Sequence, residues 1–295
     1  MELTSKDLIK LSKLAEKAAQ LAGELINNEL ALLQKGNSTI QIHSKSTGEN
    51  LASQVVTQVD LSAQKNILET LKPSIKEFDL GLLTEESTDN QSRFEKDYFW
   101  CIDPLDGTLP FIEGTTGYAV SIALVSKKGI PFIGVVFDPT TENLFTAVLN
   151  QGVNKNKKPF LPFKNSNELH FIHDRSFLNH PKYAEVLQKL ESFKLSINFE
   201  KINIISHGGA VMNAIWALEN IPSCYFKLAK SVEGGGSIWD YSSTACIYKE
   251  LGLYVSDMTG VPLQLNRRTS SFMNEYGVAY ASDEKLAKFV LSLTF

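Results

Sequence analysis

The sequence predicts a layered α/β sandwich (αβαβα): amino-terminal helices on an antiparallel sheet, an α+β arrangement, followed by a second, smaller α/β half. Apolar residues recur at the helical spacing of three and four over residues 4–36 and 57–72. Apolar runs bounded by turn residues then fill residues 79–150, and strand-like and helix-like stretches alternate from residue 169 onward. With 295 residues, 43% of them apolar, the chain can bury the core of one large or two fused domains.

The first predicted helix starts at a cap formed by Thr4 or Ser5 and ends near Gly36. Its apolar positions form a stripe on one face: Leu11, Leu14, Ala18, Leu21 and Leu25. Such a stripe is a packing face, either for the sheet of the same chain or for a twin subunit. A homodimer is therefore one possibility that the sequence leaves open.

A polar stretch, residues 38–53, follows and is predicted to be a mobile loop that can close over a site. The second helix then begins around Asp60, with Leu61, Leu68 and Leu71 facing inward and strands beginning after Pro73. Asp60 fits a helix N-cap, since its carboxylate can accept from free backbone N–H groups at the helix start.

Strands are predicted over residues 79–86 and 98–104, each running into acidic residues. An antiparallel meander over residues 118–128, 131–139 and 144–150 follows them and packs on the two helices. Residues 151–160 are polar and rich in lysine, which predicts a solvated loop between two halves. We therefore divide the chain into residues 1–155 and 156–295.

The second half is predicted to alternate between the two kinds of element, which favours a layered α/β arrangement. The predicted strands are residues 169–173, 195–199, 224–228, 253–255 and 277–282. The predicted helices are residues 183–193 and 208–218, one that begins at Trp239 and Asp240, and a closing one capped by Ser282 or Asp283.

Composition and charge exclude several classes of protein. No apolar stretch reaches the roughly 18 residues that a membrane span requires, and the first ten residues lack the apolar centre of a secretory signal. The three cysteines are scattered, which predicts reduced thiols in a cytoplasmic protein. A net charge of −4 with mixed signs argues against binding to a nucleic-acid polymer.

The segment FWCIDPLDGT, residues 99–108, carries the clearest chemical signal. A buried-strand pattern ends in Asp103 and Asp106, and short carboxylates at a rigid strand end suit hard cations such as Mg²⁺. The carbonyl of Leu105 can turn toward the same ion, while Gly107 and Thr108 offer backbone N–H groups and a hydroxyl to an anion. The alternative is an ordinary Asp-containing turn.

Two further segments end in acids at the boundary of an element. GLLTEEST, residues 81–88, is an apolar run that ends in Glu85 and Glu86. GGGSIWDYSST, residues 234–244, places Asp240 at the start of a helical pattern. Three such segments in one chain favour a shared metal site over three separate turns.

These motifs resemble those of the inositol monophosphatase family of metal-dependent, lithium-sensitive phosphatases, which also includes the 3′(2′),5′-bisphosphate nucleotidases. The Asp-Pro-x-Asp-Gly-Thr and Trp-Asp signatures both occur, and the resemblance runs from about Val56 to about Ser282. It implies two or three bound Mg²⁺ ions and a small phosphorylated substrate.

The resemblance also implies which residues hold the ions. Glu85, Asp103 and the Leu105 carbonyl would bind the first ion, and Asp103, Asp106 and Asp240 the second. Asp103 would bridge the two ions. Glu85 would help to place a third ion together with the carboxylate at the start of the second helix.

By the same resemblance, Asp60, Glu85 and Thr108 are the catalytic residues. Glu85 and the Thr108 hydroxyl would orient the attacking water, and Asp60 would polarise Thr108 as part of a proton path. The Gly107 and Thr108 N–H groups would donate to the phosphate.

Candidate substrate contacts are less sharply marked. Gly208 and Gly209 stand where a helix starts, which suits either close approach of a substrate or tight packing. Glu233 lies six residues before Trp239, where the resemblance implies an acid that contacts substrate hydroxyls, although an exposed loop glutamate explains it equally well.

The chain departs from both branches of the family after the first motif. It has Leu109-Pro110-Phe111, where the inositol enzymes usually carry Thr-Asn-Phe and the nucleotidases Lys-Glu-Phe. We therefore expect a Mg²⁺-dependent phosphomonoesterase acting on a small polyol or sugar phosphate, with inositol monophosphate as the family default. The alternatives are a 3′(2′),5′-bisphosphate nucleotidase of sulfur metabolism and, more remotely, a catalytically silent metal or nucleotide sensor.

Overall fold

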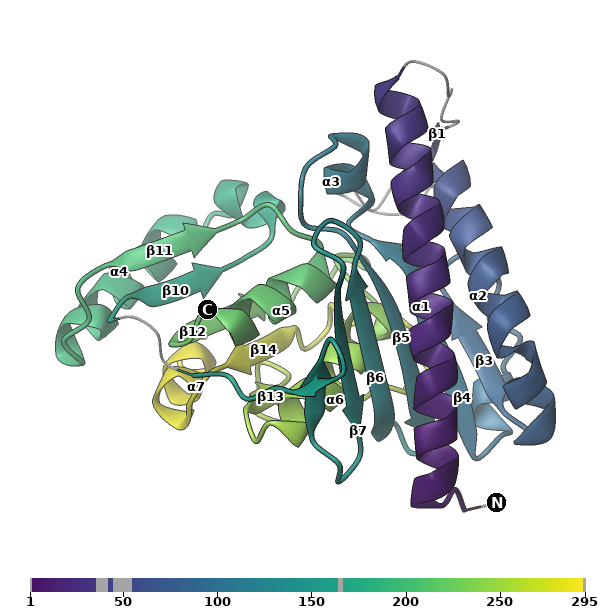
Figure 1. Cartoon of the computed structure of the whole chain (residues 1–295). Helices are drawn as coiled ribbons and strands as arrows, with labels where there is room; N and C mark the ends of the chain where they lie inside the picture. The colour runs from purple at the N-terminus through teal and green to yellow at the C-terminus, as the bar shows by residue number, and fades with distance from the viewer. Residues whose placement is uncertain (1, 36–41, 45–54, 164–166, 294–295) are drawn as a thin grey trace.

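The computed structural model describes residues 2–35, 42–44, 55–163 and 167–293 (Figure 1). These residues form two large sheets, with helices between the sheets and on their outer faces. The α-helices are α1 (Ser5–Gln34), α2 (Gln58–Glu77), α3 (Thr108–Ile112), α4 (Tyr183–Ser196), α5 (Ala210–Glu219), α6 (Ile238–Glu250) and α7 (Glu284–Leu291).

The first sheet has seven strands in the order β3-β4-β5-β6-β7-β8-β9. They are β3 (Gly81–Thr84), β4 (Tyr98–Asp106), β5 (Ala119–Ser126), β6 (Pro131–Asp138), β7 (Asn143–Val148), β8 (Val153–Lys155) and β9 (Lys158–Pro159). The second sheet has five strands in the order β11-β10-β12-β14-β13. They are β10 (Leu169–Ile172), β11 (Ile202–Ile205), β12 (Ser223–Lys227), β13 (Tyr254–Ser256) and β14 (Val278–Ala281).

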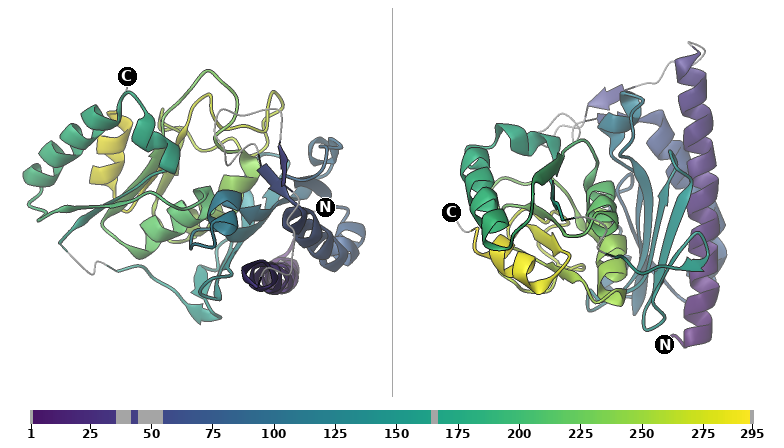
Figure 2. Two further views of the ribbon diagram at one scale, coloured as in Figure 1. Left: turned by 90° about the horizontal axis from the view of Figure 1, so that it is seen from above. Right: turned by 60° about the vertical axis from the view of Figure 1, so that its left-hand side comes forward.

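The layers follow the predicted αβαβα order. Helices α1 and α2 cover one face of the seven-stranded sheet, and α5 and α6 lie between the two sheets (Figures 1 and 2). Helices α4 and α7 cover the outer face of the five-stranded sheet. The predicted fold class is confirmed.

Helix α1 begins as the sequence predicts, because Thr4 and Asp7 form a capping box at its start. The predicted stripe is confirmed in part: Leu11 and Ala18 are fully buried, and Leu14 and Leu25 pack half-buried against the core. The fully buried positions are mostly small, namely Leu11, Ala15, Ala18, Ala19, Ala22 and Ile26. Small side chains let the helix approach β5, β6 and β7 closely, so this face packs on the chain's own sheet.

The prediction for helix α2 is confirmed at Leu71, which is buried, and at Leu68, which packs half-buried against the core. It is wrong at Leu61, which is exposed, and Val59, Ala63 and Ile67 complete the buried face. The helix also continues past Pro73 to Glu77. Its last turn is fixed by Ser74, whose hydroxyl donates to the Leu71 carbonyl and accepts from the Trp100 indole N–H.

Only three residues of the predicted loop over residues 38–53 are described. They form β1 (Ile42–Ser44), which pairs antiparallel with β2 (Val55–Thr57). The remainder of that prediction, and the predicted helix end near Gly36, lie outside the described residues.

The lysine-rich segment 151–160 was predicted to be a loop, and this prediction is wrong. It forms the hairpin β8–β9, which extends the seven-stranded sheet. Asn156 and Lys157 at its turn both have positive φ, 52° and 65°, as a two-residue hairpin turn requires. Because the turn residues are polar, the strand pattern around them is hard to see in the sequence. The division near residue 155 stays a prediction.

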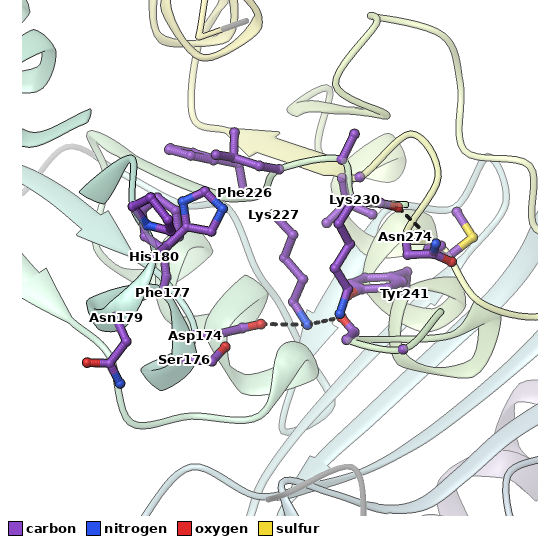
Figure 3. A pocket seen from close by; sticks show the side chains of 18 residues that line it. Asp174, Ser176, Phe177, Asn179, His180, Phe226, Lys227, Lys230, Tyr241 and Asn274 are labelled. Atoms are coloured by element: carbon purple, nitrogen blue, oxygen red, sulfur yellow. Dashed lines mark hydrogen bonds and ion pairs between the residues drawn. The ribbon is translucent and has the colours of Figure 1, made fainter. Parts of the chain in front are cut away.

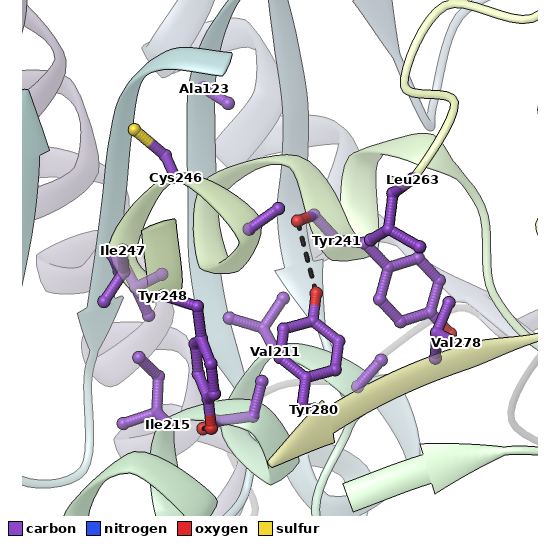
Figure 4. Close-up of a cluster of buried hydrophobic side chains, with 14 of the residues drawn as sticks. Ala123, Val211, Ile215, Tyr241, Cys246, Ile247, Tyr248, Leu263, Val278 and Tyr280 are labelled. Carbon is purple, nitrogen blue, oxygen red and sulfur yellow. Dashed lines mark hydrogen bonds between the residues drawn. The ribbon is translucent and has the colours of Figure 1, made fainter. Parts of the chain in front are cut away.

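The largest apolar cluster joins the two sheets through α5 and α6 (Figure 4). It includes Ala123 from β5, Ile215 from α5, Cys246 from α6 and Tyr280 from β14. The buried Tyr280 hydroxyl is hydrogen-bonded to Thr244 Oγ1 at 3.0 Å. Both halves of the chain therefore contribute to one core.

One strand of the second half was predicted in the wrong place. Residues 195–199 were predicted to be a strand, but α4 continues to Ser196 and the strand is β11, Ile202–Ile205. Leu195 is well exposed at the end of this helix, so its apolar character misled the prediction. Asp283 caps α7, as predicted.

Within the described residues, no helix is both long and apolar enough to cross a membrane. The three cysteines are buried and free, which agrees with the prediction of reduced thiols. Burial raises the pKa of the Cys101 thiol to about 12, so this thiol stays protonated and unreactive near neutral pH.

Candidate metal centre

The pairing of β3 with β4 determines where the first acids lie. The sequence suggested an antiparallel sheet, but these two strands are parallel, with Thr84 in register with Ile102. The next residue along β3 is Glu85, and its N–H donates to the Ile102 carbonyl at 3.2 Å. Parallel strands point to the same edge of a sheet, so Glu85 and Asp103 lie next to each other where the pairing of β3 with β4 ends.

Three carboxylates meet at this edge. Asp103, Asp106 and Asp240 each place a carboxylate oxygen within 4.8 Å of the others. Asp103 and Asp106 are buried, and Asp240 is half-buried. The structure thus brings together residues from β4 and from α6, which are far apart in the sequence.

Asp103 and Asp106 are connected by an irregular turn at the end of β4, where the pairing with β5 shifts register. The Leu105 N–H donates to Asp103 Oδ1 at 3.0 Å, and the Leu105 carbonyl accepts from the Thr108 hydroxyl at 3.4 Å. Gly107 follows with φ of 85°, a left-handed conformation that glycine adopts without strain. These contacts fix the turn that carries both acids.

Asp106 is held from the other half of the chain. Its carboxylate accepts from the N–H groups of Ala210 at 3.1 Å and Val211 at 2.8 Å, the first two residues of α5. A carboxylate at this position also meets the positive end of the helix dipole. Helix α5 therefore orients Asp106 toward the cluster.

Asp240 is oriented by its own helix. It lies in the first turn of α6, and its carboxylate accepts from the backbone N–H of Ser237, the N-cap residue. The preceding residue, Trp239, is anchored to the first sheet, since its carbonyl accepts from the Ser121 hydroxyl at 3.1 Å. The start of α6 is thus fastened to the sheet that carries the other two acids.

Burial raises the pKa of each of the three clustered acids, Asp103, Asp106 and Asp240. Burial raises the pKa of Asp103 most, and the neighbouring charges of Glu85, Asp240, Asp106 and Asp60 raise it further. Burial is also the main cause of the raised pKa values of Asp106 and Asp240. Glu85 and Asp60 therefore lie within electrostatic reach of Asp103, and their predicted roles at the site stay predictions.

The cluster fits a divalent cation. Asp103 Oδ2 is buried and accepts no hydrogen bond from the described residues. A buried carboxylate oxygen without a donor is costly unless a cation occupies its free side. Oxygen ligands at a rigid strand end are the set that Mg²⁺ and similar hard ions prefer.

Asp60 is buried in the first turn of α2. Its predicted role as N-cap is wrong, because the helix begins at Gln58 and Asp60 is already helical. The cause is that β2 ends at Thr57 and the helix follows without a loop. Thr108 begins α3, half-buried, beside the Asp103–Asp106 turn.

Comparison with known proteins agrees with this arrangement. The model of the inositol monophosphatase family matches residues 7–293. The chain belongs to the inositol monophosphatase family. Members of this family are generally metal-dependent phosphatases.

Individual relatives are distant. The chain is 29% identical over 249 residues to the Nus factor SuhB of Vibrio cholerae, covering 84% of this chain and 85% of that protein. It is 36% identical to the Nus factor SuhB of Pasteurella multocida over 143 residues, about half of each chain at 48% and 49%. It shares the fold of the inositol monophosphatase from Anabaena, with a TM-score of 0.70, 21% identity, and coverage of 97% of this chain and 96% of the other.

Sequence reasoning missed Gln64, a buried residue of α2. Its side-chain oxygen accepts from the Thr84 hydroxyl and from the Glu86 N–H at 3.2 Å, and its amide donates to Ser87 at 2.9 Å. Gln64 therefore fixes the turn that carries Glu85. The only sequence signal is its spacing of four residues after Asp60, which places both on the same face of the helix.

The two predicted glycines are closely packed: Gly209 lies beside Asp106, and Gly208 lies beside Trp216 and Asn213. A Cβ on Gly209 would lie 2.3 Å from Asp106 Oδ2, and one on Gly208 would lie 2.6 Å from the Trp216 ring. The Gly209 N–H donates to the Gly117 carbonyl at 2.8 Å. Of the two alternatives, tight packing accounts for both glycines, and a substrate contact stays a prediction.

Glu233 is exposed, and its carboxylate accepts from the Ser270 hydroxyl at 3.1 Å. Its predicted contact with substrate stays a prediction. A different charged residue, Lys227, lies at the end of β12 and forms an ion pair with Asp174 at 2.7 Å. Both line a cavity next to the start of α6 (Figure 3). Sequence reasoning did not single out either residue, because each stands alone in its segment without a motif.

Proposed function

We propose that this member of the inositol monophosphatase family is a Mg²⁺-dependent phosphomonoesterase that hydrolyses a small polyol or sugar phosphate, with inositol monophosphate as the family default. The observation that carries the proposal is the meeting of Asp103, Asp106 and Asp240 within 4.8 Å, two of them buried. Carboxylates this close to one another are stable only when some of them are protonated or when a cation neutralises their charge.

The residues that would hold two or three ions are Glu85, Asp103, Asp106, Asp240 and the Leu105 carbonyl. When bound, such ions activate water and neutralise the charge that develops on a phosphate ester during hydrolysis. Asp103 supplies Oδ2, an oxygen that accepts no hydrogen bond from the part of the chain that the structure describes. Lithium sensitivity is a further expectation from the family.

Side chains and backbone N–H groups of the chain would bind the substrate and transfer the proton of the attacking water. The Thr108 hydroxyl, now donating to the Leu105 carbonyl at 3.4 Å, would turn toward the attacking water, with Glu85 as the acceptor and Asp60 polarising Thr108. The backbone N–H groups of Gly107 and Thr108 would donate to phosphate oxygens. Gly208, Gly209 and Glu233 remain candidate substrate contacts.

One observation favours the second candidate, a 3′(2′),5′-bisphosphate nucleotidase. Lys227 and Lys230 both line the cavity beside α6, and a substrate with two phosphates would bring an anion to them. A monophosphate of a neutral polyol has no group that requires these lysines.

Phosphate release from a panel of esters tests the proposal. The panel contains inositol 1-phosphate, adenosine 3′,5′-bisphosphate, fructose 1,6-bisphosphate and histidinol phosphate, each with Mg²⁺, with chelator, and with the Asp103→Asn variant. We expect metal-dependent turnover of at least one ester that is abolished in the variant. Binding of Mg²⁺ without turnover of any ester would instead support the silent sensor.

A further inference from the structure

A cavity of about 290 Å³ opens between the end of β12 and the start of α6 (Figure 3). Its walls include Asp174, Phe177, Lys227, Lys230, Tyr241 and Asn274. This volume is close to the lower limit, about 300 Å³, of sites for small molecules. Aromatic rings, charged groups and amide groups all line it (Figure 3).

Lys227 is fixed in this cavity by two strong contacts. Its ammonium donates to Asp174 Oδ2 at 2.7 Å and to the Gly235 carbonyl at 2.6 Å. The Asp174 carboxylate is itself engaged by the chain, because its other oxygen accepts from Asn213 at 3.0 Å and from the Tyr225 hydroxyl at 3.2 Å. Asp174 and Lys227 therefore neutralise each other within a rigid network.

Lys230 adds a second cation that this network does not neutralise. An added Cβ at Gly235 would lie 3.4 Å from the Lys230 ammonium nitrogen, so both lysine ammonium groups lie beside the Gly235 backbone. Lys230 forms no ion pair with another residue of the described ranges. Two ammonium groups and one carboxylate leave the cavity with one positive charge in excess.

The cavity adjoins the metal centre. Tyr241, which lines it, directly follows Asp240, and Gly235 lies two residues before Ser237, the N-cap that holds the Asp240 carboxylate. The charge of Lys227 lowers the pKa of both Asp106 and Asp240, so the two sites lie within electrostatic reach of each other. A substrate with its phosphate at the acids can therefore extend its alcohol part into the cavity.

We propose that this cavity binds a second anionic group, a phosphate or carboxylate carried by the leaving-group side of the substrate, with Lys230 as its direct partner and Lys227 as the fixed charge behind it. The inference rests on the proposed phosphatase activity and, among the phosphate esters considered there, favours those with a second anionic group over inositol monophosphate. Asn274 lies on the same wall, where its amide nitrogen donates to the Lys230 carbonyl at 3.0 Å and has a second hydrogen to donate to the anion. The ring of Phe177 provides an apolar surface for the body of the leaving group.

Kinetics with Lys230→Met test the specificity of the site. For fructose 1,6-bisphosphate or adenosine 3′,5′-bisphosphate we expect KM to rise about tenfold, because an ionic contact to the leaving group is lost. For inositol 1-phosphate, whose leaving group is neutral, we expect less than about a twofold change. Lys230→Arg keeps the charge and should retain most of the affinity, and Lys158→Met, on the exposed strand β9, is the matched control.

Equilibrium binding in the presence of chelator separates this inference from the phosphatase proposal, since no turnover occurs there. The probes are adenosine 5′-phosphate and fructose 6-phosphate, which keep the second anion, and neutral inositol. We expect calorimetry to detect binding of both anions to the unmodified chain and weaker binding of both to the Lys230→Met variant. Neither protein should bind inositol. Tighter binding of adenosine 5′-phosphate would indicate that a nucleoside carries the second anionic group, and tighter binding of fructose 6-phosphate that a sugar carries it.

Equal effects of Lys230→Met on esters with charged and neutral leaving groups would overturn the proposal. So would anion binding that the variant leaves unchanged. If no ester is hydrolysed but the anions still bind through Lys230, the cavity is confirmed as an anion site and the phosphatase proposal fails instead.

Discussion

Glu85 and Asp103 directly follow Thr84 and Ile102, the last residues in register in the parallel strands β3 and β4. This pairing brings two acids from separate segments to one edge of the sheet. Asp106 is then fastened by the first N–H groups of α5, and Asp240 by the N-cap of α6. Three separate segments thus supply the acids of one centre and a fourth, the start of α5, orients one of them; the properties of this centre lead to the following predictions.

Replacing Asp103 should stabilise the metal-free protein while abolishing its response to metal. Asp103→Asn removes a buried charge whose neighbours repel it, so we expect the free energy of unfolding in chelator to rise by roughly 1–2 kcal/mol. Adding Mg²⁺ should raise the unfolding temperature of the unmodified chain but hardly that of the variant. Thermal unfolding with and without Mg²⁺ measures both effects.

Asp138→Asn is the matched control for that experiment. Asp138 is also buried, but its carboxylate accepts from Thr140 and Thr141 at 2.6–2.9 Å. Its loss should lower stability equally with and without Mg²⁺. If Asp103→Asn behaves in the same way as Asp138→Asn, the acidic cluster does not hold a cation.

The stability of the metal-free protein should fall as pH rises. The pKa values of Asp103, Asp106 and Asp240 are raised in the folded state above the ordinary 3.8. The folded state then binds more protons than the unfolded state above about pH 4, so deprotonation on the way to neutral pH removes stability. Mg²⁺ should oppose this loss, and its stabilising effect should grow with pH.

Unfolding temperatures between pH 4.5 and pH 8, in chelator and in Mg²⁺, test this pH dependence. We expect the two curves to diverge as the pH increases. Curves that remain parallel would show that the three acids are not the groups that titrate with folding.

Asp60→Asn should lower the rate more than it lowers affinity for the metal. In the proposed proton path Asp60 acts on Thr108, and loss of a general acid–base group typically costs about 10²–10⁴ in rate. The Mg²⁺ concentration for half-maximal activity should change by less than about threefold, since the ligands Asp103, Asp106 and Asp240 remain. A Mg²⁺ titration of kcat distinguishes the two effects, and an equal loss in both would place Asp60 among the metal ligands.

Gly209→Ala should displace Asp106 and impair activity in a folded protein. The new methyl group would lie 2.3 Å from Asp106 Oδ2, so the carboxylate or the start of α5 must shift. A displacement of this size can cost about 10² in rate. Gly152→Ala is the control, because nothing lies within 4 Å of its added Cβ. It should lower stability through its positive φ but leave kcat unchanged, and an active Gly209→Ala would contradict the proposed role of Asp106.

Local sequence patterns predicted most elements because they depend on neighbouring residues alone. The capping box of Thr4 and Asp7 and the Asp283 cap are contacts within one turn. The buried face of α1 was predicted only in part, since the side chains that are fully covered depend on how closely the helix approaches the sheet. Alanines such as Ala15 and Ala22 are buried for that reason, although leucines dominate the pattern.

The sequence by itself determined which residues could bind metal, because acids at the ends of apolar runs are a local signal that the family motifs reinforce. Only the tertiary structure decided that β3 and β4 run parallel, that α5 holds Asp106, and that Gln64 fixes the turn of Glu85. The cavity of Lys227 and Lys230 likewise depends on Asp174, a residue more than 50 positions away in the chain. Long-range pairing brings such residues together, and no short stretch of sequence encodes it.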